Sequence, residues 1–158
     1  MKIAIGADHA GFALKEQLKT FITSLGHEVK DFGAYALDPN DDYPDFVFPV
    51  AHSVAGRDAE RGIIIGSSGQ GESIAANRIK GVRSVVYYGE REPYSQTAKT
   101  GPQKSLIESV CEDNDANVLA IGASFVSPEE AGAVVEEWLS MRFPGEERHL
   151  RRIKKLDD

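Results

Sequence analysis

The sequence IIIGSSGQGESIAANR, residues 63–78, decides the fold of this chain. Three consecutive β-branched apolar residues predict a strand that is buried on both faces, as in a parallel sheet. Gly66, Gly69 and Gly71 then allow the backbone to turn tightly before Glu72 opens an amphipathic helix. Such a turn directs several unpaired N–H groups to one place, where an oxyanion or a phosphate can bind without a metal.

The same turn carries side chains that can do chemistry. Ser67, Ser68 and the carboxylate of Glu72 lie inside it, so it could both bind an anion and move a proton. No Lys follows the last glycine, and the glycine spacing differs from GxGxxG, so neither common nucleotide-binding motif is present. The alternative is a structural turn, with Ser and Gly chosen for geometry and Glu72 favoured by the helix dipole.

Composition limits the possible functions. With 158 residues, 41% of them hydrophobic and 27% charged, we expect one domain over residues 1–158. The net charge of −7 argues against a general nucleic-acid or membrane surface, so an anionic ligand needs a local basic site. A single cysteine, Cys111, excludes an internal disulfide, and its place in a helical pattern indicates packing. Without a hydrophobic leader, the chain is expected to be cytoplasmic.

Strands and helices alternate along the whole chain. Four further β segments are predicted, at residues 2–7, 27–33, 82–88 and 116–122. The alternation predicts a Rossmann-like three-layer α/β/α sandwich with a five-stranded parallel sheet and right-handed connections. Ser127, Pro128 and Glu130 give a strong helix start. Residues 89–103 form a polar connection that could be a lid or an inert loop.

Several candidate residues follow predicted strands. Asp8 and His9 come directly after the first strand, where ligands bind in open parallel sheets. Asp8 could instead cap the next helix, and Tyr43 could face the same crevice or be an ordinary loop residue. We expect these residues, the glycine turn and the EDND segment at 112–115 to meet in a single crevice at the carboxyl ends of the strands.

The C-terminal segment is basic in an otherwise acidic chain. Residues 146–156 carry five Lys and Arg side chains in a helical pattern. Arg148 and Arg152 are four apart and share a helical face, so their guanidinium groups suit a phosphate. A solvated basic helix is the alternative.

Five short motifs together carry a family resemblance. They are GADHAG at 6–11, DYP at 42–44, GSSGQGESIAAN at 66–77, NDANVLAIG at 114–122 and RHLRRI at 148–153. In this order they resemble the ribose-5-phosphate isomerase B group of sugar-phosphate isomerases, which also contains galactose-6-phosphate isomerase subunits. Each motif is weak alone, but jointly they are specific and span nearly the whole chain.

The resemblance implies an activity and an assembly. The expected reaction interconverts D-ribose 5-phosphate and D-ribulose 5-phosphate by a 1,2-proton transfer through a cis-enediolate, in the non-oxidative pentose phosphate pathway. It implies no metal or cofactor, and a homodimer or homotetramer with active sites at the subunit interface. The alternatives are an isomerase of another sugar phosphate, such as galactose 6-phosphate or allose 6-phosphate, and a non-catalytic sugar-phosphate-binding paralogue.

The resemblance also assigns roles to residues. Such chemistry needs a base over C2, donors for the developing oxyanion and a phosphate clamp. Gly66 occupies the position of a catalytic Cys in one branch of the family, so this chain resembles the other branch, in which Glu72 is the base and Ser68 helps to stabilise the enediolate. The implied substrate-binding residues are Asp8, His9, Tyr43, Gly66, Ser67, Gly69, Gln70, Gly71, Asn114, Arg148 and Arg152.

Two positions depart from the family pattern. Asp113 stands where the family has a His that helps to open the sugar ring, and Ser124 stands where it has a phosphate-binding Arg. We expect Asp113 to act as a base on the anomeric hydroxyl. The 89–103 connection is also longer than usual, and one of its basic residues is a candidate for the missing charge. These residues are Arg91, Lys99 and the adjacent Lys104.

Overall fold

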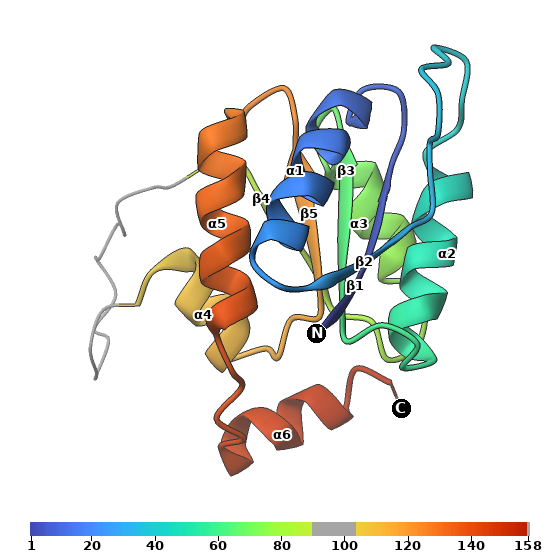
Figure 1. The fold of residues 1–158 in the computed structure, drawn as a ribbon. Helices are drawn as coiled ribbons and strands as arrows, with labels where there is room; N and C mark the ends of the chain where they lie inside the picture. The colour runs from blue at the N-terminus through green and yellow to red at the C-terminus, as the bar shows by residue number, and fades with distance from the viewer. Residues whose placement is uncertain (90–103, 158) are drawn as a thin grey trace.

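The computed structural model describes residues 1–89 and 104–157, which form a five-stranded parallel sheet between helices (Figure 1). The strand order is β2-β1-β3-β5-β4. The strands are β1 (Lys2–Ala7), β2 (Glu28–Asp31), β3 (Arg61–Gly66), β4 (Ser84–Tyr87) and β5 (Val118–Gly122). The helices are α1 (Phe12–Ser24), α2 (Pro44–Ala55), α3 (Gln70–Ala76), α4 (Leu106–Glu112), α5 (Pro128–Ser140) and α6 (Glu147–Lys154). The predicted fold class is confirmed.

Helices cover both faces of the sheet. Ile63 and Ile65 of β3 pack in one core with α1, α4 and α5, whereas Ile64 packs in the other core with α2 and α3. All three side chains are fully buried. The central strand is therefore covered on both faces, which is why its sequence is continuously apolar rather than alternating. Cys111 is buried in the first core, as its helical pattern indicates.

Local signals in the sequence match the observed helix ends. The Ser127 hydroxyl accepts a hydrogen bond from the Glu130 N–H, with Pro128 in the first turn of α5. The predicted basic helix is present as α6. The connection predicted at 89–103 lies, apart from Gly89, outside the described residues.

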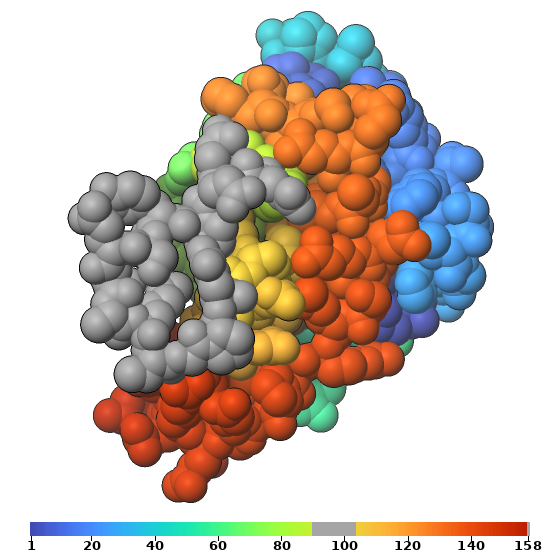
Figure 2. Space-filling model, turned by 90° about the vertical axis from the view of Figure 1, so that its left-hand side faces the viewer, coloured from blue at the N-terminus to red at the C-terminus, as the bar shows by residue number. Residues whose placement is uncertain are grey.

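Helix α6 lies across the amino ends of the strands, at the bottom of Figure 1. Figure 2 shows it (red) along the lower edge of the face formed by α4 (yellow) and α5 (orange). Asp157, just after α6, accepts hydrogen bonds from the Gly81 N–H and from Lys80, which precede β4. The C-terminal segment is therefore fixed at the edge of the sheet opposite the strand carboxyl ends.

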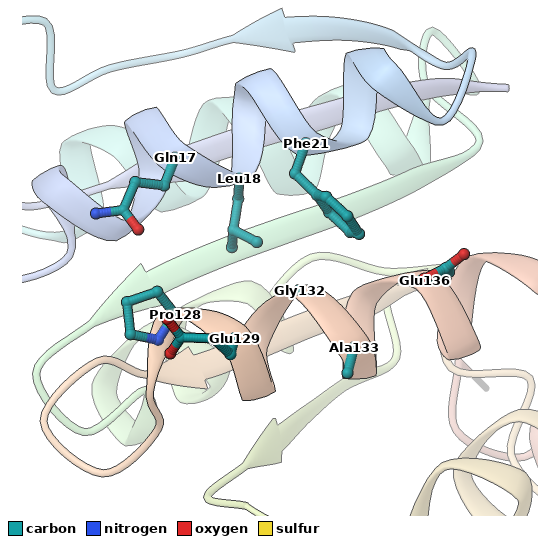
Figure 3. A pocket seen from close by; sticks show the side chains of 8 residues that line it. All are labelled: Gln17, Leu18, Phe21, Pro128, Glu129, Gly132, Ala133 and Glu136. Carbon is teal, nitrogen blue, oxygen red and sulfur yellow. The ribbon is translucent and has the colours of Figure 1, made fainter.

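A groove runs between α1 and α5 on one face of the molecule (Figure 3). Leu18 and Phe21 project from α1 towards α5, and Gly132 lies below Phe21. None of the candidate site residues lines this groove.

Within the described ranges, no helix is long and apolar enough to cross a membrane.

Candidate active site

The carboxyl ends of three adjacent strands meet at one edge of the sheet. Asp8 and His9 follow β1, the glycine turn follows β3, and Ser124 lies two residues beyond β5. The strands are in register, with Ala7 opposite Ile65 and Gly66 opposite Gly122. The predicted site residues from the first half of the chain are thus close together in space.

The glycine turn presents unpaired backbone donors. Gly69 has φ +72° and forms the N-cap of α3, a conformation that glycine adopts without strain. The Ser68 hydroxyl accepts a hydrogen bond from the Gln70 N–H at 3.3 Å. Within the described part of the chain, no partner exists for the N–H groups of Ser67, Ser68, Gly69 and Gly71. These donors can stabilise an oxyanion.

Glu72 lies beside this turn and is 5% exposed. Its carboxylate fills the space above Gly66, where any Cβ would overlap it. Burial raises the pKa of Glu72, against a lowering by its own backbone N–H, and the nearby charge of Asp8 raises it further. A carboxylate whose pKa is raised by burial is a stronger base when ionised than a solvated one.

Tyr43 and Asp8 border Glu72 from two other segments. A Cβ at Gly71 would lie 3.0 Å from Cζ of Tyr43, so the phenol ring rests against the first turn of α3. Asp8 Oδ1 accepts hydrogen bonds from the N–H groups of Ala10 and Gly11 at 3.0 and 3.1 Å. The N-cap of α1 is Gly11, so Asp8 closes the turn before this helix instead of capping the helix itself.

Two contacts at this edge were not predicted from the sequence. Ser124 is hydrogen-bonded through its hydroxyl to the Ser67 hydroxyl at 2.9 Å, which ties the end of β5 to the glycine turn. Asp41 accepts hydrogen bonds from both the backbone N–H and the ring of His9. Asp41 lies in the acidic run DPNDD, where the sequence gives no reason to single out one carboxylate.

The second group of predicted residues lies at the opposite edge of the sheet. Asp113 and Asn114 fall between α4 and the amino end of β5, and Arg148 and Arg152 belong to α6. The Asn114 carbonyl accepts a hydrogen bond from Nε of Arg83, which precedes β4. The expectation that EDND joins the strand carboxyl ends is therefore wrong. A segment that leads into a strand of a parallel sheet lies at the amino end of that strand. A single copy of the chain therefore cannot bring the residues at the two opposite edges of the sheet into one crevice.

Asp113 is engaged in an ion-pair network. Lys104 Nζ lies 2.7 Å from Asp113 and 3.0 Å from Glu112. The hydrogen bond from Lys104 lowers the pKa of Asp113, which makes this carboxylate a weaker base at neutral pH. Lys104 is the only one of the three candidate phosphate cations within the described residues, and its charge is already paired; Arg91 and Lys99 lie outside them.

Within residues 1–89 and 104–157, one group of three side chains could hold a metal ion. The ligand atoms of Asp8, His9 and Asp41 lie within 4.8 Å of one another. However, His9 Nδ1 and Asp41 Oδ1 are 2.6 Å apart, and Asp8 Oδ1 already accepts two N–H groups. We interpret the group as a hydrogen-bonded cluster, not as a metal centre.

Comparison with known proteins identifies the family of this chain. The family described as Ribose/Galactose Isomerase matches residues 3–156. The chain belongs to this family. Ribose-5-phosphate isomerase B of Escherichia coli is 37% identical over 155 residues, covering 98% of this chain and 93% of that protein. A putative sugar phosphate isomerase of Bacillus subtilis, YwlF, is 35% identical over 158 residues, covering 100% and 96% of the two chains.

Solved structures of the ribose/galactose isomerase family show the same fold. Ribose-5-phosphate isomerase B of Clostridium thermocellum has a TM-score of 0.86 at 38% identity, covering 99% of this chain and 95% of that one. The Mycoplasma genitalium enzyme, solved with bound ribulose 5-phosphate, has a TM-score of 0.82 at 32% identity, covering 98% and 93%. The chain is accordingly a sugar-phosphate isomerase.

Proposed function

We propose that this isomerase interconverts D-ribose 5-phosphate and D-ribulose 5-phosphate, with Glu72 as the base. The observation that carries the proposal is the Glu72 carboxylate, which is buried above Gly66 beside a turn of unpaired N–H groups. In the open-chain aldose, Glu72 removes the proton from C2 and returns it to C1, while the proton of the C2 hydroxyl passes to the oxygen on C1. The N–H groups and the Ser68 hydroxyl stabilise the negative charge that develops on the oxygens meanwhile.

The sugar and its phosphate contact the remaining residues at this edge. We assign Asp8 and Tyr43 to the sugar hydroxyls, because they border Glu72, and His9 to the phosphate. Arg148 and Arg152 complete the phosphate site, and Asn114 donates to the substrate. Asp113 keeps only a polar role near the ring oxygen, because its charge is compensated by Lys104.

The separation of the two groups supports a site shared between two copies of the chain. Since α6 lies at the amino ends of the strands, its guanidinium groups can reach a Glu72 site only if they come from a second protomer. The side chain of Arg148 is paired with the exposed Glu146 at 2.8 Å, and Arg152 has no ion-pair partner within the described ranges. We propose a homodimer, alone or within a tetramer, with two such shared sites.

Exposed apolar side chains beside the glycine turn support this assembly. Leu106 and Phe125 are 47% and 62% exposed and, with Tyr88, line a cavity that reaches Ser68. The ring of Tyr88 meets that of Phe125 edge-on at 5.4 Å. An apolar surface next to a polar site is typical of a region that another chain covers.

Direct assay of ketose formation tests the reaction. Purified protein should isomerise ribose 5-phosphate in the presence of a chelator, and Glu72→Gln should lower kcat by about a hundredfold or more, because general-base catalysis supplies that much. Binding of the substrate should change little, since the amide has the same shape. Turnover that disappears with the chelator, or that survives in Glu72→Gln, would contradict the proposed mechanism.

A substrate panel separates the remaining candidates. The departures at Asp113 and Ser124 lie where ring form and phosphate position are read, so galactose 6-phosphate and allose 6-phosphate belong in the panel. If one of these has a higher kcat/KM than ribose 5-phosphate, that sugar phosphate is the substrate instead. Binding of sugar phosphates without conversion of any of them to the isomeric sugar phosphate would identify a binding protein instead.

A further inference from the structure

His9 is held by one carboxylate from a different segment. Asp41 lies between β2 and α2, and its Oδ1 is 3.1 Å from the backbone nitrogen of His9 and 2.6 Å from His9 Nδ1. The backbone group can only donate, so the Asp41 oxygen is an acceptor there. An ionised carboxylate also accepts from the ring, which places a proton on Nδ1.

Asp41 has few other partners. Its side chain is 9% exposed, against 38% for that of His9. The second oxygen, Oδ2, is buried and has no hydrogen-bond partner, and no Lys or Arg within the described residues pairs with this carboxylate. A buried carboxylate without another cation favours positive charge on the one group that it contacts.

The other ring nitrogen of His9 remains available. Nε2 makes no hydrogen bond to any residue that the structure describes, although the ring is partly exposed at the edge that carries Glu72. The ring is thus fixed at one nitrogen and open at the other. This is the arrangement that a group needs if it is to meet an anionic ligand in one orientation.

We infer that Asp41 is a positioning residue for anion binding: it orients the His9 ring, keeps a proton on Nδ1 and leaves Nε2 to meet the phosphate of the substrate. The inference rests on the proposed function for the identity of that anion. Asp41 itself does not touch the substrate.

The positive charge of protonated His9 favours anion binding in addition to the orientation of its ring. The hydrogen bond that His9 donates to Asp41 raises the pKa of His9, partial burial opposes the rise, and the charges of Asp8, Asp41 and Asp38 add to it. Among the described residues, these three carboxylates are the charged groups with the largest effect on His9. A protonated His9 donates from Nε2 and brings a positive charge to a site in a chain whose net charge is −7.

The tautomer of His9 in the wild-type protein tests the inference directly. The chain has four histidines, so ¹⁵N-labelled protein gives a small set of ring signals, and His9→Gln identifies those of His9. Above the titration midpoint, we expect neutral His9 to carry its proton on Nδ1. A proton on Nε2 instead would overturn the inference, because Asp41 would then not set the tautomer.

Asp41→Asn separates charge from shape. The amide oxygen can still accept from His9, but the charge is lost, so the His9 midpoint should move to lower pH. At pH 8, inorganic phosphate should bind about tenfold more weakly than to wild type, and the difference should narrow as the pH falls and His9 becomes protonated in both proteins. Asp38→Asn, in the same loop but not in contact with His9, should shift the midpoint less.

These experiments can disprove the role of Asp41 independently of whether the protein isomerises ribose 5-phosphate. An unchanged midpoint in Asp41→Asn, or an affinity loss equal at every pH, would show a purely structural role and overturn the inference. The tautomer and phosphate titrations need no turnover, so they remain decisive if ribose 5-phosphate is not isomerised. If it is isomerised, Asp41→Asn should raise KM at pH 8 with little change in kcat.

Discussion

Gly66 and Glu72 share a space that holds only one side chain. A Cβ at position 66 would overlap the Glu72 carboxylate, so any larger residue there would have to displace that carboxylate from its place. This steric exclusion accounts for a glycine at position 66 while the Glu72 carboxylate occupies the space beside it.

A double-mutant cycle tests that exclusion. Gly66→Ala should destabilise the protein by about 1–3 kcal/mol through overpacking and should displace the base, so that kcat falls sharply. In a Glu72→Ala background the same change should cost much less, because the space is then empty. Chemical denaturation of the four proteins gives the coupling; additive losses would show that the two residues do not compete.

Burial of Glu72 should also make stability depend on pH. A carboxyl group whose folded-state pKa is raised binds its proton more tightly when folded, so stability falls as pH rises from the unfolded pKa through the folded one. Glu72→Gln removes this loss. Its Tm should exceed that of the wild type at pH 7–8 and approach it in acid.

A surface control defines the effect of Glu72. Glu136 of α5 is exposed, so Glu136→Gln should follow the wild type within about 0.5 kcal/mol throughout the pH range. A Glu72→Gln variant that is less stable than the wild type at neutral pH would contradict the raised pKa.

Helix α1 is joined to β2 by a buried charge cluster. Lys15 is fully buried and its Nζ lies 2.9 Å from Asp31 and 2.6 Å from Glu16. Burial would raise the pKa of Asp31, but hydrogen bonds from Lys19 and Lys15 lower it overall. Breaking such a pair leaves an uncompensated buried charge, which is costly.

Asp31→Asn should therefore destabilise the fold by about 2–3 kcal/mol at neutral pH. This is less than the loss expected for a buried ion pair with no other partner, because Lys15 still pairs with Glu16. A group with a lowered pKa contributes stability above its unfolded pKa and loses it as pH falls through the folded one, so the difference from wild type should shrink in acid. Urea denaturation measures both effects.

Glu28→Gln is the matched control on the same strand. Its ion pair with Lys2 is exposed, so the loss should be about 0–1 kcal/mol. Equal losses in the two variants would mean that burial of the Lys15 cluster adds nothing.

Elements that depend only on neighbouring residues were predicted correctly from the sequence. The β-branched run of β3, the cap at Ser127 and the glycine turn each depend on neighbouring residues alone. Asp113 and Asn114 were misplaced because strand direction, not proximity in sequence, decides which edge a segment occupies. Asp41 was missed because its contact with His9 joins two loops 32 positions apart, and nothing in an acidic run marks one member.

At the scale of the assembly, the proposed shared site draws on both edges of the sheet. One edge has Glu72 and the backbone N–H groups of the glycine turn; the other has two guanidinium groups, and both Arg148 and Arg152 are exposed. In the proposed dimer, these cations would place positive charge beside the substrate phosphate, although the chain has a net charge of −7. Twofold symmetry would generate two equivalent sites from one contact.

The most direct test is subunit complementation. Glu72→Gln and the double variant Arg148→Ala with Arg152→Ala are each expected to be nearly inactive at low ribose 5-phosphate. Random mixing of the two should restore about a quarter of wild-type activity, because half of the dimers are mixed and each has one intact site. Mixed dimers, verified by native mass spectrometry, that show no activity beyond that of the separate variants would contradict a shared site with Glu72 as its base.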